Sequence, residues 1–229
     1  MSKRLIIAID GPAGAGKSTL ARRVADRVGA LYIDTGAMYR AIALWALRQQ
    51  IPCDDAHRIE SLAQHAQIEF QSGQCRILLN GEDVSDQIRT PEVATAASQV
   101  AAIPGVRRAM VALQRDIASR SSIVMEGRDI GSVVFPEADV KIYLDASTEI
   151  RAQRRAEELT AKQIPFDLML LRAQIEERDS RDRNRAASPL LQAEDATYLD
   201  SSSLSPSEVE EEILRIIRSK TSNGKVLVP

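Results

Sequence analysis

The sequence predicts an α/β fold with a parallel core sheet flanked by helices, and two observations carry the prediction. Short aliphatic runs typical of buried strands alternate along the chain with patterns of helical periodicity. Acidic residues stand at or just past the ends of four of these runs, at Asp10, Asp34, Glu126 and Asp145. Such alternation implies parallel strands joined by right-handed crossovers, and ligands then gather at the carboxyl ends of the strands.

The first strand is expected at residues 5–9, an uninterrupted aliphatic run, and a glycine-rich loop follows it. From Gly11 this loop reads G-x-x-x-x-G-K-S, the spacing of a phosphate-binding loop. Backbone N–H groups of such a loop surround an anion, Lys17 adds a point charge, and the Ser18 hydroxyl is placed to face Mg²⁺. A helix follows, with apolar residues at every fourth position: Leu20, Val24 and Val28.

The other core strands are expected at residues 31–34, 122–126, 140–145 and 197–200. The acidic residues at the strand ends have two interpretations. They could hold a metal or orient a phosphate acceptor, or they could simply cap the helices that follow. The sequence leaves this choice open.

The region from about residue 51 to 105 breaks the alternation. Two strand-like runs between residues 67 and 84 are separated by Ser72 and Gly73, which predicts a hairpin. A helix is expected to begin at Thr90 and Pro91 and to run to Ala102. We interpret this region as an insert over the strand ends, so that residues 1–229 form a single domain with a flexible tail at 220–229.

Composition narrows the possible partners. The chain has 229 residues and a formal net charge of −2, which argues against a general binder of nucleic acids or membrane surfaces. No apolar run reaches membrane-spanning length, and the apolar stretch before Asp10 is too short for a secretory signal. Cys53 and Cys75 have no metal-binding or disulfide pattern, so free thiols are expected. We expect a cytoplasmic monomer.

Two segments at strand ends contain charged residues that are not required to form the fold. Residues 34–40 place a hydroxyl at Thr35 and a guanidinium at Arg40 near the start of a helix, which outlines a second anion site. In the glycine-flanked segment 126–131, Arg128 and Asp129 are expected to stand over the same cleft. A buried structural ion pair is the alternative for these two residues.

A third charged segment covers residues 176–185, where Arg178, Asp182 and Arg185 fall on one face of a helix. The segment also contains opposite charges four residues apart, as an ordinary solvated helix does. The phosphate-binding loop favours the functional interpretation. Transfer between two phosphorylated molecules brings negative charges together, each pair at about 4 Å costing about 4 kcal/mol at an effective dielectric constant of 20. Arginines and Mg²⁺ usually offset this cost.

Six segments together resemble the bacterial cytidylate kinases, a family of P-loop nucleoside monophosphate (NMP) kinases. In chain order they are residues 11–18, 34–40, 89–93, 126–136, 143–146 and 178–185. The resemblance implies a P-loop kinase fold in three parts. These are a core at about 1–50, 106–150 and 186–219, an NMP-binding insert at about 51–105, and a mobile lid with its following charged helix at about 151–185.

The resemblance also implies the site residues. The ATP site would comprise the phosphate-binding loop and one lid arginine: Gly11, Pro12, Ala13, Gly14, Ala15, Gly16, Lys17, Ser18, Thr19 and Arg154. The CMP site would comprise three groups: Arg40, Arg128 and Arg185 at the phosphate; Thr35, Tyr39, Ser98, Arg107 and Asp129 around the base; Arg178 and Asp182 at the sugar. Lys17, Arg128 and Arg185 would be catalytic, and Ser18 would face the metal.

The implied activity is transfer of the γ-phosphoryl group of ATP, with Mg²⁺, to CMP or dCMP in pyrimidine nucleotide metabolism. Two alternatives remain open. Another small-molecule kinase would act on UMP, AMP or a metabolite without phosphate, although the last would not need three guanidinium groups for its acceptor. A nucleotide-dependent switch or nucleic-acid-binding NTPase would use residues 178–185 as a basic contact, which the acidic residues of that segment disfavour.

Overall fold

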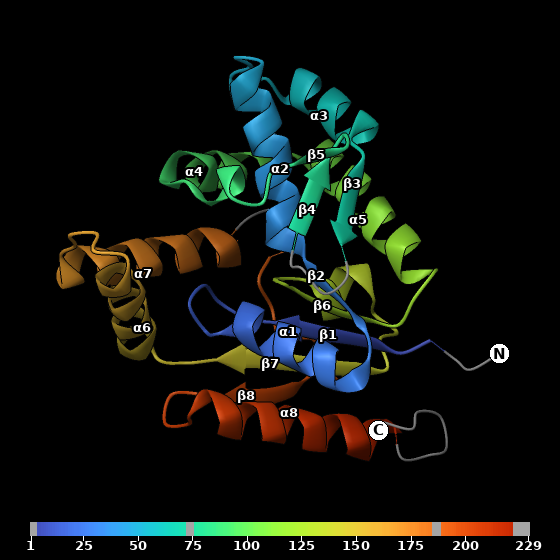
Figure 1. The fold of residues 1–229 in the computed structure, drawn as a ribbon, viewed down its shortest axis with the longest axis vertical. Coiled ribbons are helices and arrows are strands. Elements are labelled where there is room, and N and C mark those ends of the chain that lie inside the picture. The colour runs from blue at the N-terminus through green and yellow to red at the C-terminus, as the bar shows by residue number, and fades with distance from the viewer. Residues whose placement is uncertain (1–3, 72–75, 185–188, 222–229) are drawn as a thin grey trace.

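The computed structural model describes residues 4–71, 76–184 and 189–221, and Figure 1 shows their arrangement. A five-stranded sheet forms the centre of the fold, with the order β2-β6-β1-β7-β8. All its neighbouring strands pair in parallel. Its strands are β1 (Ile6–Asp10), β2 (Leu31–Asp34), β6 (Ile123–Gly127), β7 (Val140–Asp145) and β8 (Thr197–Asp200). The predicted parallel core sheet is confirmed, with each strand within one residue of its expected position.

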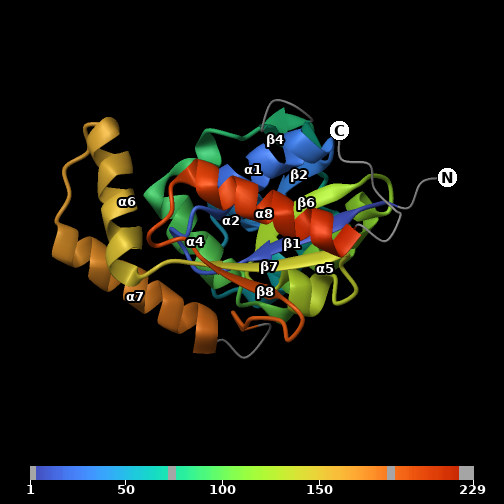
Figure 2. The ribbon, with the colours of Figure 1, turned by 90° about the horizontal axis from the view of Figure 1, so that it is seen from below.

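Both faces of the sheet are covered, which explains why its strands are continuous aliphatic runs. Along β1, Ile7 and Ile9 belong to one buried cluster and Ala8 to another, because successive side chains point to opposite faces. Helices α1 (Lys17–Val28) and α8 (Pro206–Thr221) belong to the first cluster and lie side by side in Figure 2. Helices α2 (Thr35–Arg48) and α5 (Pro104–Ala118) belong to the second.

The register brings the strand ends level with one another. Asp10 at the end of β1 lies opposite Gly127 of β6, and Asp34 at the end of β2 lies opposite Glu126. The loops that follow these three strands therefore leave the sheet at one edge. This edge is where the phosphate-binding loop and the charged segment after β6 meet.

The segment between α2 and α5 carries a second, antiparallel sheet with the order β3-β4-β5 (Figure 1). Its elements are α3 (Ala56–His65), β3 (Ile68–Gln71), β4 (Arg76–Leu79), β5 (Glu82–Asp83), the short helix η1 (Gln87–Arg89) and α4 (Pro91–Val100). The hairpin prediction is confirmed by the pairing of β3 with β4. Its expected turn at Ser72 and Gly73, like Cys75, lies outside the described residues, and β5 was not predicted.

Helix α4 begins as expected and ends earlier than expected. The Thr90 hydroxyl accepts a hydrogen bond from the backbone N–H of Val93 at 3.2 Å, and Pro91 occupies the first turn. The helix ends at Val100 rather than at Ala102. Pro104 starts α5 soon afterwards, and the residue before a proline is disfavoured in helical conformation.

Two helices, α6 (Thr148–Ala161) and α7 (Leu168–Asn184), project from the side of the sheet as a pair (Figures 1 and 2). Asp179 is the one buried residue of α7 among the residues that the structure describes. A short π-helical turn, η2 (Ile130–Val134), follows β6. In the part of the chain that the structure describes, no helix combines the length and the apolar character needed to cross a bilayer.

Candidate active site

A cavity of about 660 Å³ opens at the carboxyl ends of β1, β2 and β6. Its walls come from the loop after β1, the start of α2, the continuous segment from α4 to the start of α5, the loop after β6 and the last turns of α7. Five segments that are far apart in the sequence therefore enclose one space. Its volume is within the range of small-molecule sites.

The loop after β1 has the backbone geometry of an anion-binding loop. Gly11, Gly14 and Gly16 have φ values of 149°, 79° and 89°. These values lie in the region that side chains other than glycine rarely adopt. Helix α1 then begins at Lys17 with no side-chain hydrogen bond capping its N-terminus. Its first N–H groups therefore remain directed at the loop, where a phosphate is stabilised by the helix dipole.

Gly11→Ala is expected to lower the free energy of unfolding by about 2 to 5 kcal/mol, because backbone strain and overpacking add. A Cβ atom at Gly11 would lie 1.9 Å from the backbone oxygen of Leu144. Gly29→Ala is the matched control, since Gly29 also has a positive φ of 66° but has nothing within 4 Å. It is expected to cost about 1 to 2 kcal/mol. Urea unfolding of both variants checks this, and equal losses would contradict the packing argument.

Lys17 lies buried at the centre of the loop, where its ammonium group donates to the backbone oxygen of Pro12 at 2.6 Å. Burial lowers the pKa of Lys17 to about 7, and the neighbouring Arg128 adds to the lowering, while Glu126 and Asp10 oppose it. A protonated lysine is thus costly here without an anion. Phosphate groups in the loop would supply the missing negative charge.

The carboxylates at the strand ends turn out to have different structural roles. Asp10 accepts hydrogen bonds from the backbone N–H groups of Ile130 at 2.8 Å and Gly131 at 2.7 Å, so it fixes the turn after β6. Burial raises the pKa of Asp10 to about 6, although these two hydrogen bonds act against the rise. Asp34 caps α2 by accepting from the N–H of Ala37 at 2.9 Å, as the capping interpretation expected.

The other two strand-end carboxylates, Asp145 and Glu126, do not cap the helices that follow them. The hydroxyl of Ser147, not the Asp145 carboxylate, caps α6, and Asp145 accepts from the neighbouring Ala146 N–H at 2.8 Å. Glu126 is buried and accepts a hydrogen bond from the Tyr32 hydroxyl at 2.6 Å. Burial and the nearby Asp34 raise the pKa of Glu126, while Lys17 and a hydrogen bond with Ser18 lower it.

Glu126, Asp34 and Ser18 all line the cavity. Together they present carboxylate and hydroxyl oxygens, the donor atoms that Mg²⁺ prefers. From the sequence, Glu126 was expected at the end of a strand, but it was not among the predicted ATP-, CMP- or metal-binding residues. Its position at a strand end was the available signal, since an acidic residue there can hold a metal ion.

The structure brings together most of the residues expected around CMP. Nine of them line the cavity: Thr35, Tyr39, Arg40, Ser98, Arg107, Arg128, Asp129, Arg178 and Asp182. Arg185 lies outside the described residues. From the phosphate-binding loop, Ala13, Gly14, Lys17 and Ser18 line the same cavity, and Thr19 lines an adjoining one of about 560 Å³. Arg154 does not line either cavity and instead donates to the backbone oxygen of Ser201 at 2.7 Å.

Ion pairs fix the side chains around this cavity. Arg107 and Asp129 form a buried pair, and the Arg107 guanidinium lies 5.6 Å from the centre of the Tyr39 ring. Arg128 donates through Nε to Asp182 of α7 at 2.8 Å. Arg128 and Asp129 are therefore paired with residues of other elements, and the alternative of a structural pair between the two is wrong.

Helix α7 also departs from the picture of an ordinary solvated helix. Of the pairs expected within the helix, Glu177 and Arg181 lie 3.8 Å apart. Asp179 instead pairs with Arg151 of α6 at 2.7 Å, and Asp182 pairs with Arg128 after β6. The carboxylates of α7 thus tie the helix to the rest of the site.

Positive charge accumulates where α7 meets the cavity. Burial lowers the pKa of Arg178, and the guanidinium groups of Arg128, Arg40 and Arg181 lower it further, while Asp182 opposes them. The Nε of Arg40 is buried with no hydrogen-bond partner among the described residues. Such a cluster fits a ligand that carries several negative charges. Arg181 was missed in the sequence, although its position three residues after Arg178 places it on the same face.

Comparison with known proteins agrees with this geometry. A family model described as cytidylate kinase matches residues 7–219. A cytidylate kinase from Solibacter usitatus is 60% identical over 225 residues, covering 97% of this chain and 96% of the relative. One from Pasteurella multocida is 47% identical over 220 residues, covering 95% and 97% of the two chains.

A solved structure supports the fold independently. Shikimate kinase from Bacteroides thetaiotaomicron superposes with a TM-score of 0.50 at 13% identity, covering 95% of this chain and 98% of the other. At this identity the similarity concerns the fold alone, which is that of a P-loop kinase. The match of the family model and the two full-length relatives go further: the chain belongs to the cytidylate kinase family.

Proposed function

We propose that this protein transfers the γ-phosphoryl group of ATP to the phosphate of CMP or dCMP, giving ADP and CDP or dCDP. One observation carries the proposal: the anion-binding loop and a cluster of arginines from three elements face one cavity. The membership of the cytidylate kinase family supports the choice of nucleotide. A site for a single phosphorylated ligand would not need both groups of cations.

The reaction needs little covalent chemistry from the protein. The acceptor oxygen of a nucleoside monophosphate is already ionised near neutral pH, so no general base is required. Catalysis then consists of positioning and charge stabilisation. In the proposed mechanism Lys17 holds the transferred group, while Arg40 and Arg128 neutralise the acceptor phosphate. We propose that Arg185 joins this group, since it follows the last described turn of α7.

The oxygen donors at the cavity fit a magnesium ion. We propose that the Ser18 hydroxyl holds Mg²⁺ with ATP and that Glu126 supports it, because a hydrogen bond already links these side chains. The bound ion would neutralise charge on the donor phosphate oxygens. Glu126 then orients Ser18 in the absence of nucleotide, and burial together with the nearby Asp34 raises the pKa of its carboxyl.

The base is assigned to the side of the cavity formed by α2, α4 and α5. Arg107 and Asp129 offer polar groups for cytosine next to Tyr39, with Thr35 and Ser98 nearby. Thr35 donates to the backbone oxygen of Glu126 at 2.7 Å, which fixes its orientation. A pocket with paired polar groups penalises a base that leaves them unpaired.

The proposal also covers the residues that bind the sugar and the two segments that are expected to move, the NMP-binding insert and the lid. We place the sugar hydroxyls at Arg178 and Asp182 of α7. The segment from 51 to 105 is proposed as the NMP-binding insert and that from 151 to 185 as the lid. Arg154, held by Ser201 in the described state, would have to move to reach the donor phosphates. Closure of such a lid excludes water, which otherwise competes as the acceptor.

A comparison of several candidate phosphate acceptors tests this proposal. ADP release from Mg·ATP is measured with CMP, dCMP, UMP, AMP and no acceptor, in parallel on the same protein. Turnover with CMP and dCMP at least tenfold above the others is expected, because unpaired polar groups discriminate strongly. Equal ADP release without an acceptor would indicate an NTPase. Preference for UMP or AMP would indicate a different monophosphate kinase.

A second prediction follows from the pKa of Lys17. Burial lowers the pKa of Lys17 to about 7, so without nucleotide a substantial fraction of the lysine is neutral at about pH 7.5. Bound phosphates raise that pKa, so binding of Mg·ATP is expected to take up a proton. Calorimetry in two buffers of different ionisation enthalpy measures the uptake. Lys17→Met is the control and should abolish it; an unchanged uptake in this variant would assign the proton elsewhere.

A further inference from the structure

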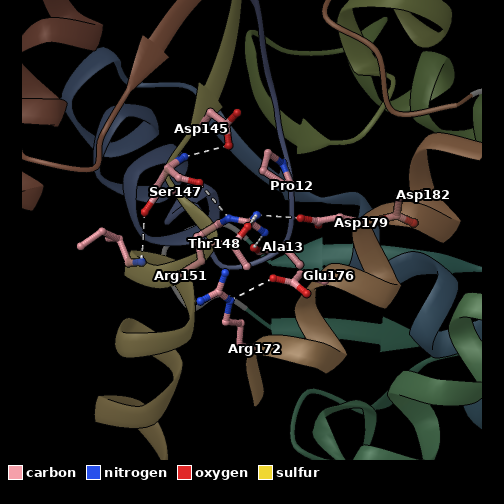
Figure 3. Close-up of polar contacts among 12 residues, drawn as sticks. Pro12, Ala13, Asp145, Ser147, Thr148, Arg151, Arg172, Glu176, Asp179 and Asp182 are labelled. Atoms are coloured by element: carbon pink, nitrogen blue, oxygen red, sulfur yellow. Dashed lines mark hydrogen bonds and ion pairs between the residues drawn. The ribbon is translucent and has the colours of Figure 1, made fainter. Parts of the chain in front are cut away.

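Arg151 of α6 lies where the phosphate-binding loop, α6 and α7 meet, and Figure 3 shows its guanidinium between Ala13, Thr148 and Asp179. Arg151 and Asp179 are only 3% and 4% exposed. Charged side chains are seldom buried this deeply unless they are paired and hydrogen-bonded. The proposed phosphoryl transfer assigns no role to either residue.

Every nitrogen of the Arg151 guanidinium has a partner. Nε donates to the backbone oxygen of Ala146 at 2.9 Å, and Nη1 donates to the backbone oxygen of Ala13 at 3.0 Å. Nη2 donates to the Thr148 hydroxyl at 3.0 Å and pairs with the Asp179 carboxylate at 2.7 Å. One side chain therefore joins the end of β7, the phosphate-binding loop and α7. The planar, rigid guanidinium transmits a displacement of one partner to the others.

The phosphate-binding loop also packs directly on this side chain. A Cβ atom at Gly14 would lie 3.2 Å from the Cβ of Arg151, which is a tight contact. Ala13 and Gly14 both line the candidate active site. The loop cannot change its conformation at these two residues without disturbing Arg151.

On the other side, Asp179 belongs to the turn of α7 that faces the proposed acceptor. Arg178 and Asp182 line the cavity, and Asp182 binds Arg128 at 2.8 Å. The same helical turn is thus held by Arg151 at Asp179 and by Arg128 at Asp182. One carboxylate oxygen of Asp179 is buried without a hydrogen-bond partner among the described residues, so Arg151 provides the charge that balances it.

We propose that the buried Arg151–Asp179 pair is a positioning device that couples the donor site to the acceptor site. A nucleoside triphosphate in the loop and a nucleoside monophosphate against α7 would each strengthen the binding of the other through this pair. The inference rests on the proposed function, since it assumes both ligands. Coupling of this kind is reciprocal and usually amounts to about 5- to 150-fold in affinity.

The experiment measures the affinity for Mg²⁺ with a non-hydrolysable ATP analogue, by calorimetry, without CMP and with saturating CMP. The ratio of the two dissociation constants is the coupling factor. It is expected to be at least about fivefold in the unmodified protein. In Asp179→Asn, which keeps the shape but removes the charge, the ratio should fall close to one. A change confined to stability would leave this ratio unaltered.

Arg172→Ala is the matched control. Arg172 also joins α7 to α6, through Glu149 at 2.7 Å, but this pair is about half exposed, and among the described residues the Arg172 guanidinium pairs with Glu149 and Glu176 rather than with the phosphate-binding loop. The control should keep the coupling factor of the unmodified protein. The double variant Arg151→Met with Asp179→Leu removes both buried charges, leaves neither unpaired and should also lack coupling.

The outcomes separate this inference from the proposed function. A coupling factor near one in the unmodified protein, an unchanged factor in Asp179→Asn, or an equal loss in Arg172→Ala would each overturn the coupling role. In all these cases CMP turnover by the unmodified protein is measured alongside. If CMP is phosphorylated, the proposed function stands and only the coupling fails; if it is not, the proposed function itself fails.

Discussion

Replacing Lys17 by methionine is expected to lower kcat by about 100-fold or more, which corresponds to a loss of about 2.7 kcal/mol of transition-state stabilisation. Lys17 is the buried cation at the centre of the phosphate-binding loop, and its ammonium group is held only 2.6 Å from the Pro12 backbone oxygen. Charge on the transferred group develops beside it. Steady-state rates with Mg·ATP and CMP provide the measurement.

The same substitution should not destabilise the protein. The folded-state pKa of Lys17, about 7, lies below its ordinary value of 10.5, so below pH 7 the charged lysine costs the folded state stability. This cost is lost as the pH rises from about 7 to 10.5. Methionine removes it, and Tm without nucleotide should be unchanged or higher. A variant that keeps its activity would exclude Lys17 from the reaction, and one that simply unfolds would contradict this account of its burial.

Replacing Arg128 by alanine is expected to lower kcat/KM for CMP by about 10- to 150-fold, because a hydrogen bond to a charged group contributes about 1.5 to 3 kcal/mol. Arg128 lies on the glycine-flanked loop after β6, binds Asp182 of α7 and lowers the pKa values of Lys17 and Arg178. It therefore stands between the donor and the acceptor. The KM for ATP should change much less.

Arg120→Ala is the control for this variant, since the Arg120 side chain is 73% exposed, lies just after the end of α5 and pairs with Asp116 of that helix. It should leave both kinetic constants within about twofold, because surface ion pairs contribute less than about 1 kcal/mol. If Arg128→Ala raised the KM for ATP and CMP equally, Arg128 would be a general structural residue. An acceptor role would then be untenable.

The parts of the fold that follow from local chemistry could be predicted from the sequence. Aliphatic runs set the five parallel strands, and the glycine spacing after β1 set the phosphate-binding loop. The helix start at Pro91 followed from the fixed φ of proline. These features depend on neighbours along the chain, so the sequence displays them directly.

Features that depend on tertiary partners could not be predicted. Asp179 and Asp182 each have an arginine four residues away on the same helix, yet their ion-pair partners are Arg151 and Arg128 in other elements. The charged segment at residues 176–185 gives no hint of this, because packing rather than spacing selects the partner. The prediction for Arg154 considered only its place in the lid, whereas the described state holds it at Ser201.

Some residues of the candidate acceptor site were predictable only through family resemblance. The positions of Ser98 and Arg107 in the sequence carry no local pattern, yet the structure places both on the cavity. For Glu126, by contrast, the sequence showed a local pattern but not the contacts of the side chain. Its position at a strand end was visible, but its contacts with Ser18 and Tyr32 required the register of β2 with β6.

The most direct test of the central claim is the fate of the phosphoryl group. The protein is mixed with CMP and with Mg·ATP that carries an isotope label in its γ-phosphoryl group. The products are then separated, and their masses are measured by mass spectrometry. We predict one labelled CDP for each ADP formed and no labelled inorganic phosphate. Label that appears in inorganic phosphate while CMP remains unchanged would contradict the claim, since the chain would then hydrolyse ATP rather than transfer its phosphoryl group.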